Sequence, residues 1–246
     1  MLVKKTLLLL LTLSFIVPAW AWQPVDWSTS NVQVLYGGDF IFGEQTRATV
    51  TLEHAHGWKY GQNFFFVDMF NNNGFEVYAE VYSYLSLAKM TGADVRVGPI
   101  KDFSLAGGVN VSNRPAERNF QAYLVGISFD LANQYFDYLQ LDVMAYKDDS
   151  VHSWGVQYTP VWSFPFTLGP TKFKFRGFID IKDANTNALG NVSMLAQPQL
   201  LLDVGDLAGW KSDTLYIGTE FSYWLNKFGV KDANEAAWQG MIIGFF

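Results

Sequence analysis

The stretch KFKFRGFIDIK, residues 172–182, decides the fold class. Apolar residues occupy alternate positions, at Phe173, Phe175, Gly177, Ile179 and Ile181. Charged residues occupy most of the intervening positions, at Lys172, Lys174, Arg176, Asp180 and Lys182. Successive side chains of a β-strand point to opposite faces, so this strand has one apolar and one charged face. A transmembrane β-barrel requires that pattern, because its strands meet lipid on one side and a wet interior on the other.

The same alternation recurs in segments of about ten residues that are separated by clusters of Asn, Asp and Gly. From Phe75 to Tyr82, for example, Phe75 and Val77 oppose Glu76 and Tyr78. The pattern predicts an all-β, antiparallel barrel of about twelve strands, near 30–42, 47–57, 63–70, 75–86, 93–111, 119–130, 138–147, 152–162, 171–182, 192–203, 214–224 and 236–246.

The fifth segment, 93–111, is longer than a tilted barrel strand needs, and it contains Gly98 and Pro99. Splitting it would give thirteen strands, whereas bacterial single-chain barrels have even numbers. Val95 and Val97 also share their side-chain phase with Leu105. We therefore expect one continuous strand with a bulge or kink at Pro99.

Both ends of the chain carry predicted targeting signals. Lys4 and Lys5 precede an apolar run, residues 7–17, and small residues follow at Ala19 and Ala21. This layout predicts a signal peptide over residues 1–21, cleaved after Ala21, and a barrel over 22–246. At the other end, Phe246 closes an alternating strand and is the expected recognition mark for the outer-membrane assembly machinery. The predicted location is the outer membrane of a Gram-negative bacterium, with lipid around the barrel.

Charge and cysteine content narrow the possible partners. Without residues 1–21 the chain holds 15 basic and 23 acidic side chains, a net charge of about −8. Such an acidic chain is a poor match for nucleic acid, which is bound through basic surfaces. The chain has no cysteine, so closed strand pairing and packing must supply its stability.

The inward-facing positions of the predicted strands mix carboxylates, cations and aromatic rings. A flat heterocycle can stack on Phe or Tyr while its hydroxyls bond to carboxylates. The alternative is that the rings only fill a narrow barrel. Phe64, Phe66 and Tyr82 are the favoured ligand contacts. The full predicted lumen set is Glu53, Phe64, Phe66, Asp68, Glu76, Tyr78, Glu80, Tyr82, Arg96, Asp142, Lys174, Arg176, Asp180 and Glu220.

The histidines are the main candidates for metal ligands or catalytic residues. His54 and His56 share a strand face, but only two ligands are visible, so an interfacial position is favoured over a metal site. Some outer-membrane barrels are lipid enzymes that use a Ser and a His. Ser153 adjoins His152, so their side chains would point to opposite faces of a strand. We expect no enzyme, no catalytic residue, no cofactor and no metal, and an enzyme stays the weakest alternative.

Several short stretches resemble the nucleoside-specific outer-membrane channels of the Tsx and OmpK type. They are TGADVRVGPIKD at 91–102 preceded by Glu80, Leu52 and Glu53 with the strand of Asp68, YLVGISFDL at 123–131, and the closing aromatic strand. The resemblance implies a narrow, monomeric, twelve-stranded barrel that passes nucleosides passively. It also implies a possible receptor role for phages or colicins through the outer loops.

The chain departs from those channels in two respects. Its loops are shorter, and its N-terminal segment offers Trp22, Trp27, Tyr36, Phe40 and Phe42 in place of closely spaced aromatics. Two alternatives to a nucleoside channel therefore stay open. One is a channel for another small solute, and the other is a closed or non-selective barrel that acts as a receptor or structural protein.

Overall fold

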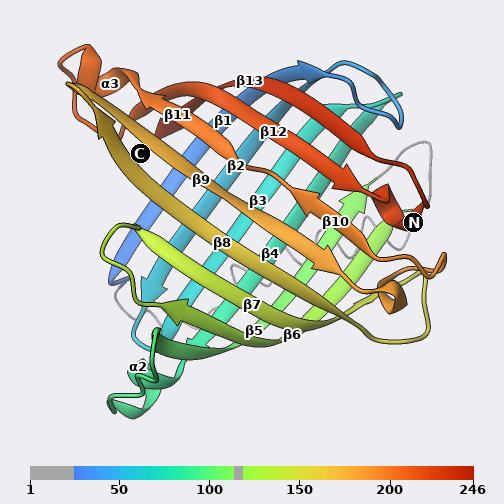
Figure 1. The fold of residues 1–246 in the computed structure, drawn as a ribbon, viewed down its shortest axis with the longest axis horizontal. Helices are drawn as coiled ribbons and strands as arrows, with labels where there is room; N and C mark the ends of the chain where they lie inside the picture. Colours follow the sequence, from blue (N-terminus) through green and yellow to red (C-terminus); the bar gives the residue numbers. More distant parts are fainter. Residues whose placement is uncertain (1–24, 114–118) are drawn as a thin grey trace, which may run out of the picture.

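Antiparallel pairing joins each strand to the next and finally joins the last strand to the first (Figure 1). The computed structural model describes residues 25–113 and 119–246. The predicted signal peptide and its cleavage site lie outside these residues. The strands are β1 Trp27–Gly38, β2 Arg47–Trp58, β3 Gly61–Asn71, β4 Phe75–Ser86, β5 Ile100–Asn113, β6 Phe120–Leu131, β7 Tyr138–Asp148, β8 Gly155–Leu168, β9 Thr171–Lys182, β10 Ser193–Ala196, β11 Gln199–Asp203, β12 Leu215–Leu225 and β13 Glu235–Phe245.

β10 and β11 occupy one position in the ring, since each pairs with β9 on one side and with β12 on the other. Gln197 and Pro198 interrupt this strand. Pairing nevertheless continues through the break, because the Gln197 amide donates to Phe178 O (3.1 Å) and the Phe221 amide donates to Pro198 O (3.0 Å). The described strands therefore form a closed barrel of twelve positions, which confirms the predicted fold.

The prediction of one continuous strand over 93–111 is wrong. β4 is followed by a short helix, α2 (Leu87–Thr91), and then by a loop that turns back at Gly98 and Pro99 before β5 begins. Gly98 has φ +56°, a left-handed conformation that suits glycine, and the residues beside this turn, Val97 and Ile100, exchange two backbone hydrogen bonds of 3.0 Å. The strand count is unaffected, because this segment is a long connection between β4 and β5.

The barrel has two unlike ends. The terminal end carries Phe246, α2, and the short helix α3 (Val204–Leu207), and both helices lie at the rim (Figure 1). The opposite end, here the loop end, carries the connections 39–46, 72–74, 149–154, 183–192 and 226–234, with single 3₁₀ turns at 184–186 and 227–229. No helix in the described ranges has the length and apolar character needed to cross a membrane.

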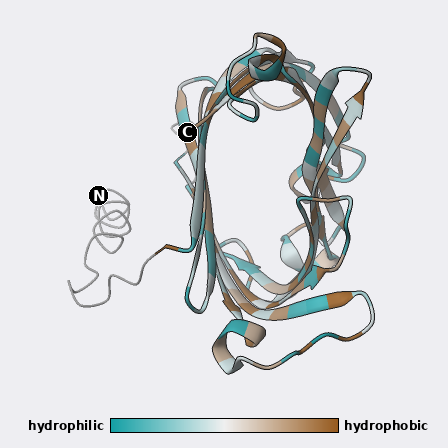
Figure 2. Cartoon of the chain, turned by 90° about the vertical axis from the view of Figure 1, so that its left-hand side faces the viewer, coloured by the Kyte–Doolittle hydropathy of each residue, from teal (hydrophilic) through white to brown (hydrophobic). Residues whose placement is uncertain are grey.

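Side-chain alternation places apolar residues on the outside of the barrel and polar residues inside it, the reverse of their distribution in a water-soluble protein. Val81, Val125 and Ile127 lie on the outer wall and are about half exposed, while Gln33, Gln199 and Gln239 are buried inside. The end-on view shows a flattened ring whose opening is longer in one direction (Figure 2). Apolar side chains outside and polar ones inside are typical of a barrel whose outer wall faces lipid.

Candidate functional site

The barrel encloses a cavity of about 1310 Å³ that receives side chains from every described strand and from loops at both ends. Thirteen acidic and seven basic residues line it. Thirteen of the fourteen residues predicted to face the lumen are among the lining residues, and Arg96 is the exception. Alternation therefore identifies the interior, and the contacts between the side chains decide how that interior is divided.

An ion pair crosses the lumen between β2 and β9. Arg176 Nη1 lies 2.9 Å from Glu53 Oε1, and the two side chains are 10% and 21% exposed. The Glu53 carboxylate also accepts hydrogen bonds from Asn31 (2.7 Å) and Gln33 (3.3 Å), and Arg176 Nε donates to Gln199 (2.7 Å). Charge-assisted bonds of this kind are stronger than neutral ones, so the pair fixes the separation of the two walls.

The interior beyond this ion pair, toward β11, β12, β13 and β1, is packed. Leu201 and Ile243 are fully buried there in one apolar cluster with Leu35, Tyr216 and Met241. Beside the cluster, Glu220 accepts hydrogen bonds from three glutamines, Gln199 (2.8 Å), Gln239 (2.8 Å) and Gln197 (3.2 Å). Packed apolar groups and hydrogen-bonded polar groups narrow this side of the lumen.

The opposite side, between β4 and β7, is closed by a second set of contacts. Tyr84 donates to Asp142 (3.0 Å), and Gln62 on β3 donates to Gln140 on β7 (3.3 Å). Gln140 in turn donates to Asp142 (2.7 Å). These groups border a second apolar cluster, formed by Tyr82, Tyr84, Ala106, Ala122, Leu124, Met144 and Tyr146.

Aromatic rings and carboxylates alternate between these two closed sides. Phe66 on β3 is paired with Glu53 on β2 and with Glu80 on β4, so its ring stands between two acidic positions. Phe64, two residues away on the same face, has its ring centroid 6.1 Å from that of Phe66. Asp68, next along this face, accepts a hydrogen bond from Thr51 (2.5 Å). Phe64 and Phe66 are half-buried, so each ring retains a surface toward the cavity.

Neutral donors hold two further predicted lumen carboxylates. Glu80 accepts from the Tyr78 hydroxyl and from Asn110 Nδ2 (2.8 Å). Asp180 accepts from Gln157 (3.0 Å) and Thr159 (2.7 Å). These bonds orient both carboxylates along the wall.

Tyr82, a favoured ligand contact in the sequence analysis, is only 7% exposed. Its hydroxyl donates to Asn110 (3.1 Å), and its ring lies over Gly108, where a Cβ would come within 2.4 Å of the ring. Tyr82 is thus a packed wall residue, whereas Phe64 and Phe66 keep accessible ring surface.

Two predicted lumen residues lie toward the ends of the barrel. Glu76 accepts from Asn72 (3.0 Å) at the loop end. Lys174 contacts Asp137 (3.6 Å) and Asp213 (3.3 Å) at the terminal end. Burial opposes ionisation of Asp213, but its hydrogen bond from Tyr216 and the nearby Lys174 outweigh this and lower its pKa. Asp213 therefore stays ionised and holds the rim loop against Lys174.

Arg96 was predicted to enter the lumen and does not. It lies in the turn before β5, its side chain is 75% exposed, and its Nε is 3.7 Å from Asp94. The prediction failed because the two valines around it imitate a strand, while Gly98 and Pro99 reverse the chain.

Three further lumen residues are absent from the predicted set, and alternation could have identified only Tyr138 and Glu235, because Lys227 lies in a 3₁₀ turn outside the strands. Tyr138 shares its phase with Gln140 and Asp142, lines the cavity and is 44% exposed. At the loop end, Lys227 forms a buried ion pair with Glu235, whose carboxylate also accepts from the Ile41 amide (2.9 Å). The position of Tyr138 at the first residue of a strand gave too short a pattern on its own.

His54 and His56 lie on the outer wall, whereas His152 lies in the connection 149–154 at the loop end. His54 Nδ1 is 2.7 Å from Ser30 Oγ, His54 Nε2 is 3.1 Å from His56 Nδ1, and Asn63 is 2.9 Å from His56 Nε2. This polar row continues across the outer face of β1, β2 and β3. No group of three or more His, Cys, Asp or Glu residues suited to a metal ion occurs within the described part of the chain.

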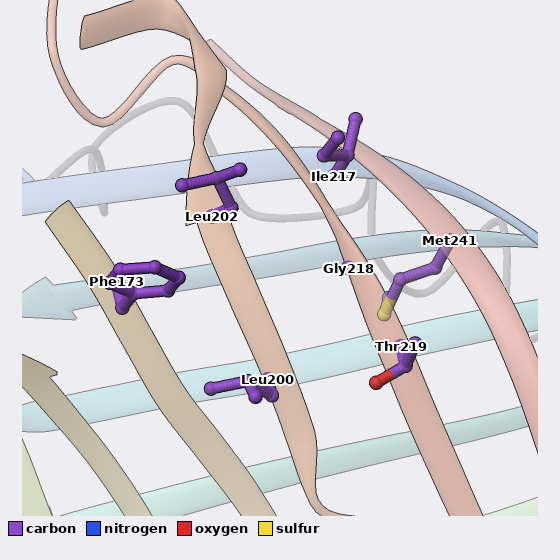
Figure 3. Close-up of a pocket in the computed structure, with 7 residues that line it drawn as sticks. All are labelled: Phe173, Leu200, Leu202, Ile217, Gly218, Thr219 and Met241. Carbon is purple, nitrogen blue, oxygen red and sulfur yellow. The ribbon is translucent and has the colours of Figure 1, made fainter. Parts of the chain in front are cut away.

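A shallow apolar groove of about 360 Å³ also lies on the outer wall (Figure 3). Its lining residues are Phe173, Leu200, Leu202, Ile217, Gly218, Thr219 and Met241. Gly218 and its strand partner Met241 belong to inward-facing positions, and both contribute to the lining of the groove. The groove is apolar, as expected for a surface in contact with lipid chains.

Comparison with known proteins gives a family and a fold. Residues 29–238 match the family described as a domain of unknown function (DUF5020). No curated protein matches the chain. The KdgM porin superposes on 89% of this chain and 99% of its own, with a TM-score of 0.50 and 9% identity, a likeness that establishes the barrel fold.

Two further solved structures are similar at lower scores. The NanC porin covers 88% of this chain and 99% of its own, with 12% identity and a TM-score of 0.48. The translocator domain of the autotransporter NalP from Neisseria meningitidis covers 99% of this chain and 95% of its own, with 11% identity and a TM-score of 0.40. Since the family match extends over most of the chain, the chain belongs to the DUF5020 family.

Proposed function

We propose that this protein is a channel of the bacterial outer membrane through which nucleosides and similar small solutes pass passively. The observation that carries the proposal is the lumen row in which Phe66 stands between Glu53 and Glu80, with Phe64 beside it. A ring can stack on these phenylalanines while hydroxyl groups reach the carboxylates. The barrel fold shared with the KdgM porin and the apolar outer wall support the location and the passive transport.

Nucleosides are the proposed substrate class because they combine a flat base with a hydroxylated sugar. The resemblance of residues 91–102 and 123–131 to the Tsx and OmpK channels supports the same choice. The acidic lining, thirteen acids against seven bases, disfavours anionic solutes such as nucleotides. The proposed channel works as a monomer, since the cavity lies within a single closed ring.

Liposome swelling tests this function directly. Folded protein in liposomes should pass uridine faster than N-acetylglucosamine, a sugar of similar mass. The double variant Phe64→Ala, Phe66→Ala should lose that preference, whereas Phe65→Ala, which removes a ring from the outer wall of the same strand, should keep it. Equal flux of the two solutes through the wild-type protein would contradict the proposal.

A receptor role for phages or colicins is the second candidate, and one observation favours it. Two connections of the loop end are bonded to each other, since Asn191 donates to Gly229 O (2.9 Å) and Asn226 donates to Val192 O (2.9 Å). Such bonds give the exposed surface a defined shape. Deleting residues 187–190 should then abolish adsorption while barrel assembly is retained, and unchanged adsorption would exclude this surface.

A further inference from the structure

Two of the cross-lumen contacts leave an interval between them. The pair Glu53–Arg176 and the pair Gln62–Gln140 both connect the wall formed by β2 and β3 to the wall formed by β7 and β9. They lie on either side of Phe64 along the first wall. Gln62 precedes Phe64 by two residues on β3. On β2, Ala55 is paired with Phe64, and Glu53 lies two residues from Ala55 in the opposite direction from Gln62. A solute that passes between these contacts must pass Phe64, which lines the cavity.

Tyr138 occupies the matching interval on the second wall. It is two residues from Gln140 on the same face of β7, and it is joined to Arg176 through Ser163 by successive strand pairings. These pairings place Tyr138 in register with Arg176, one member of the ion pair. Tyr138 is nevertheless 44% exposed, so its ring borders open space in the cavity.

We infer that Tyr138 and Phe64 form the two faces of an aromatic slot, bounded at its edges by Glu53–Arg176 and Gln62–Gln140, and that this slot selects flat solutes. The inference rests on the proposed function and names the residue that confers its specificity. From a strand spacing of about 4.8 Å and a rise of about 3.3 Å per residue, the backbone span between the two edges is on the order of 12 Å. The side chains that project into that span narrow it further.

Flat and chair-shaped solutes respond differently to such a slot. A planar base can slide between two rings and gain contact with both, because aromatic groups favour offset stacking. A chair-shaped sugar is thicker and gains no stacking, so the same rings obstruct it. The two bounding contacts fix the distance between the walls, since one is an ion pair with additional hydrogen bonds and the other belongs to the Gln140–Asp142 group.

Solute flux through Tyr138 variants tests the slot. We would measure the uridine to N-acetylglucosamine flux ratio by liposome swelling for wild type, Tyr138→Ala, Tyr138→Phe and Tyr158→Ala, the last being an outer-wall control on β8. Tyr138→Ala should lower the ratio about fivefold, as expected for one lost stacking partner. Tyr138→Phe and Tyr158→Ala should leave the ratio unchanged.

The outcomes separate the slot from the proposed function. A wild-type protein that passes both solutes equally would overturn both. A selective wild type whose ratio is unchanged in Tyr138→Ala would overturn the slot alone. The double variant Gln62→Ala, Gln140→Ala supplies a second measurement, because removing that edge should raise single-channel conductance and admit N-acetylglucosamine. Unchanged conductance in the correctly folded double variant would also overturn the slot.

Discussion

Arg176 and Glu53 are bonded at 2.9 Å although their strands, β9 and β2, are five positions apart in the barrel ring. Strand pairing alone holds only neighbours together, so this contact adds a connection through the interior. It separates the packed side of the lumen, where Leu201 and Ile243 are buried, from the side that contains Phe64 and Tyr138. Under the proposed function, the solute path runs on the side of Phe64 and Tyr138.

The first prediction concerns the stability supplied by this pair. Arg176→Met leaves the Glu53 carboxylate without its cation in a largely buried position and should reduce the free energy of unfolding by on the order of 2–4 kcal/mol. Adding Glu53→Gln removes the uncompensated charge and should recover a substantial part of that loss. Guanidinium unfolding of the protein in lipid vesicles measures both values.

Lys172→Met is the matched control, because the Lys172–Asp206 pair lies at the exposed rim. Surface ion pairs contribute little, so this variant should unfold as the wild type does. A double variant that is less stable than Arg176→Met alone would show that the charge left on Glu53 is not the source of the instability.

The second prediction concerns the loop end. Glu235 binds Lys227 and the Ile41 amide together, so one carboxylate ties the connection 39–46 to the connection 226–234. Phe42 and Phe228 stack above this site with their centroids 6.0 Å apart. Lys227→Met should release both connections, and limited chymotrypsin digestion should then cut them several times faster.

Lys231→Met is the control for that experiment, because Lys231 is an exposed residue of the same connection. Its digestion rate should match that of the wild type. Equal rates for Lys227→Met and Lys231→Met would show that the Glu235 contacts do not hold the loop end together.

Sequence alternation predicted the barrel well because it is a local property. Each strand must present apolar residues to one side and polar residues to the other, and residues 172–182 show this without any knowledge of their neighbours. Alternation failed at residues 93–99, where Val95 and Val97 have the right phase but the chain reverses at Gly98. A single left-handed residue outweighs two correctly spaced valines, and the spacing cannot reveal it.

The division of the lumen could not be predicted from the sequence. It depends on which side chains meet across the interior, and that depends on strand register and on the flattening of the ring. Alternation placed Glu53 and Arg176 in the lumen, but nothing in either strand showed that they would bond to each other. Alternation also treated Tyr82 and Phe64 alike, although the first is packed against Gly108 and the second borders the cavity.

The third prediction concerns the orientation of the barrel in the membrane. The chain has no cysteine, so single cysteines can be introduced at Glu44 on the loop end and at Asp94 on the terminal end, both exposed. If the terminal end faces the periplasm, as in bacterial barrels whose termini are periplasmic, a membrane-impermeant maleimide should label Glu44→Cys on intact cells. Asp94→Cys should react only after the outer membrane is permeabilised. The reverse pattern would invert the orientation.

The fourth prediction concerns Phe246, which is 81% exposed beyond the end of β13 and contacts the ladder through its amide, 3.0 Å from Ser30 O. Its even-numbered neighbours Trp238 and Ile242 lie on the outer wall, so a variant that lacks Phe246 keeps its lumen intact. If Phe246 is the assembly mark, deleting it should reduce the fraction of protein that reaches the outer membrane in folded form. Flux per folded molecule should stay at the wild-type value.

Phe245→Ala is the matched control for that deletion. Phe245 faces inward, where its ring packs edge-on against Tyr216 at a centroid distance of 5.7 Å and lies 5.6 Å from the Arg176 guanidinium. Its loss should alter the lumen near the ion pair and leave delivery to the membrane unchanged. The folded fraction follows from heat-dependent migration on gels of outer-membrane extracts. Normal delivery of the protein without Phe246, together with poor delivery of Phe245→Ala, would assign the assembly mark to the inward-facing ring instead.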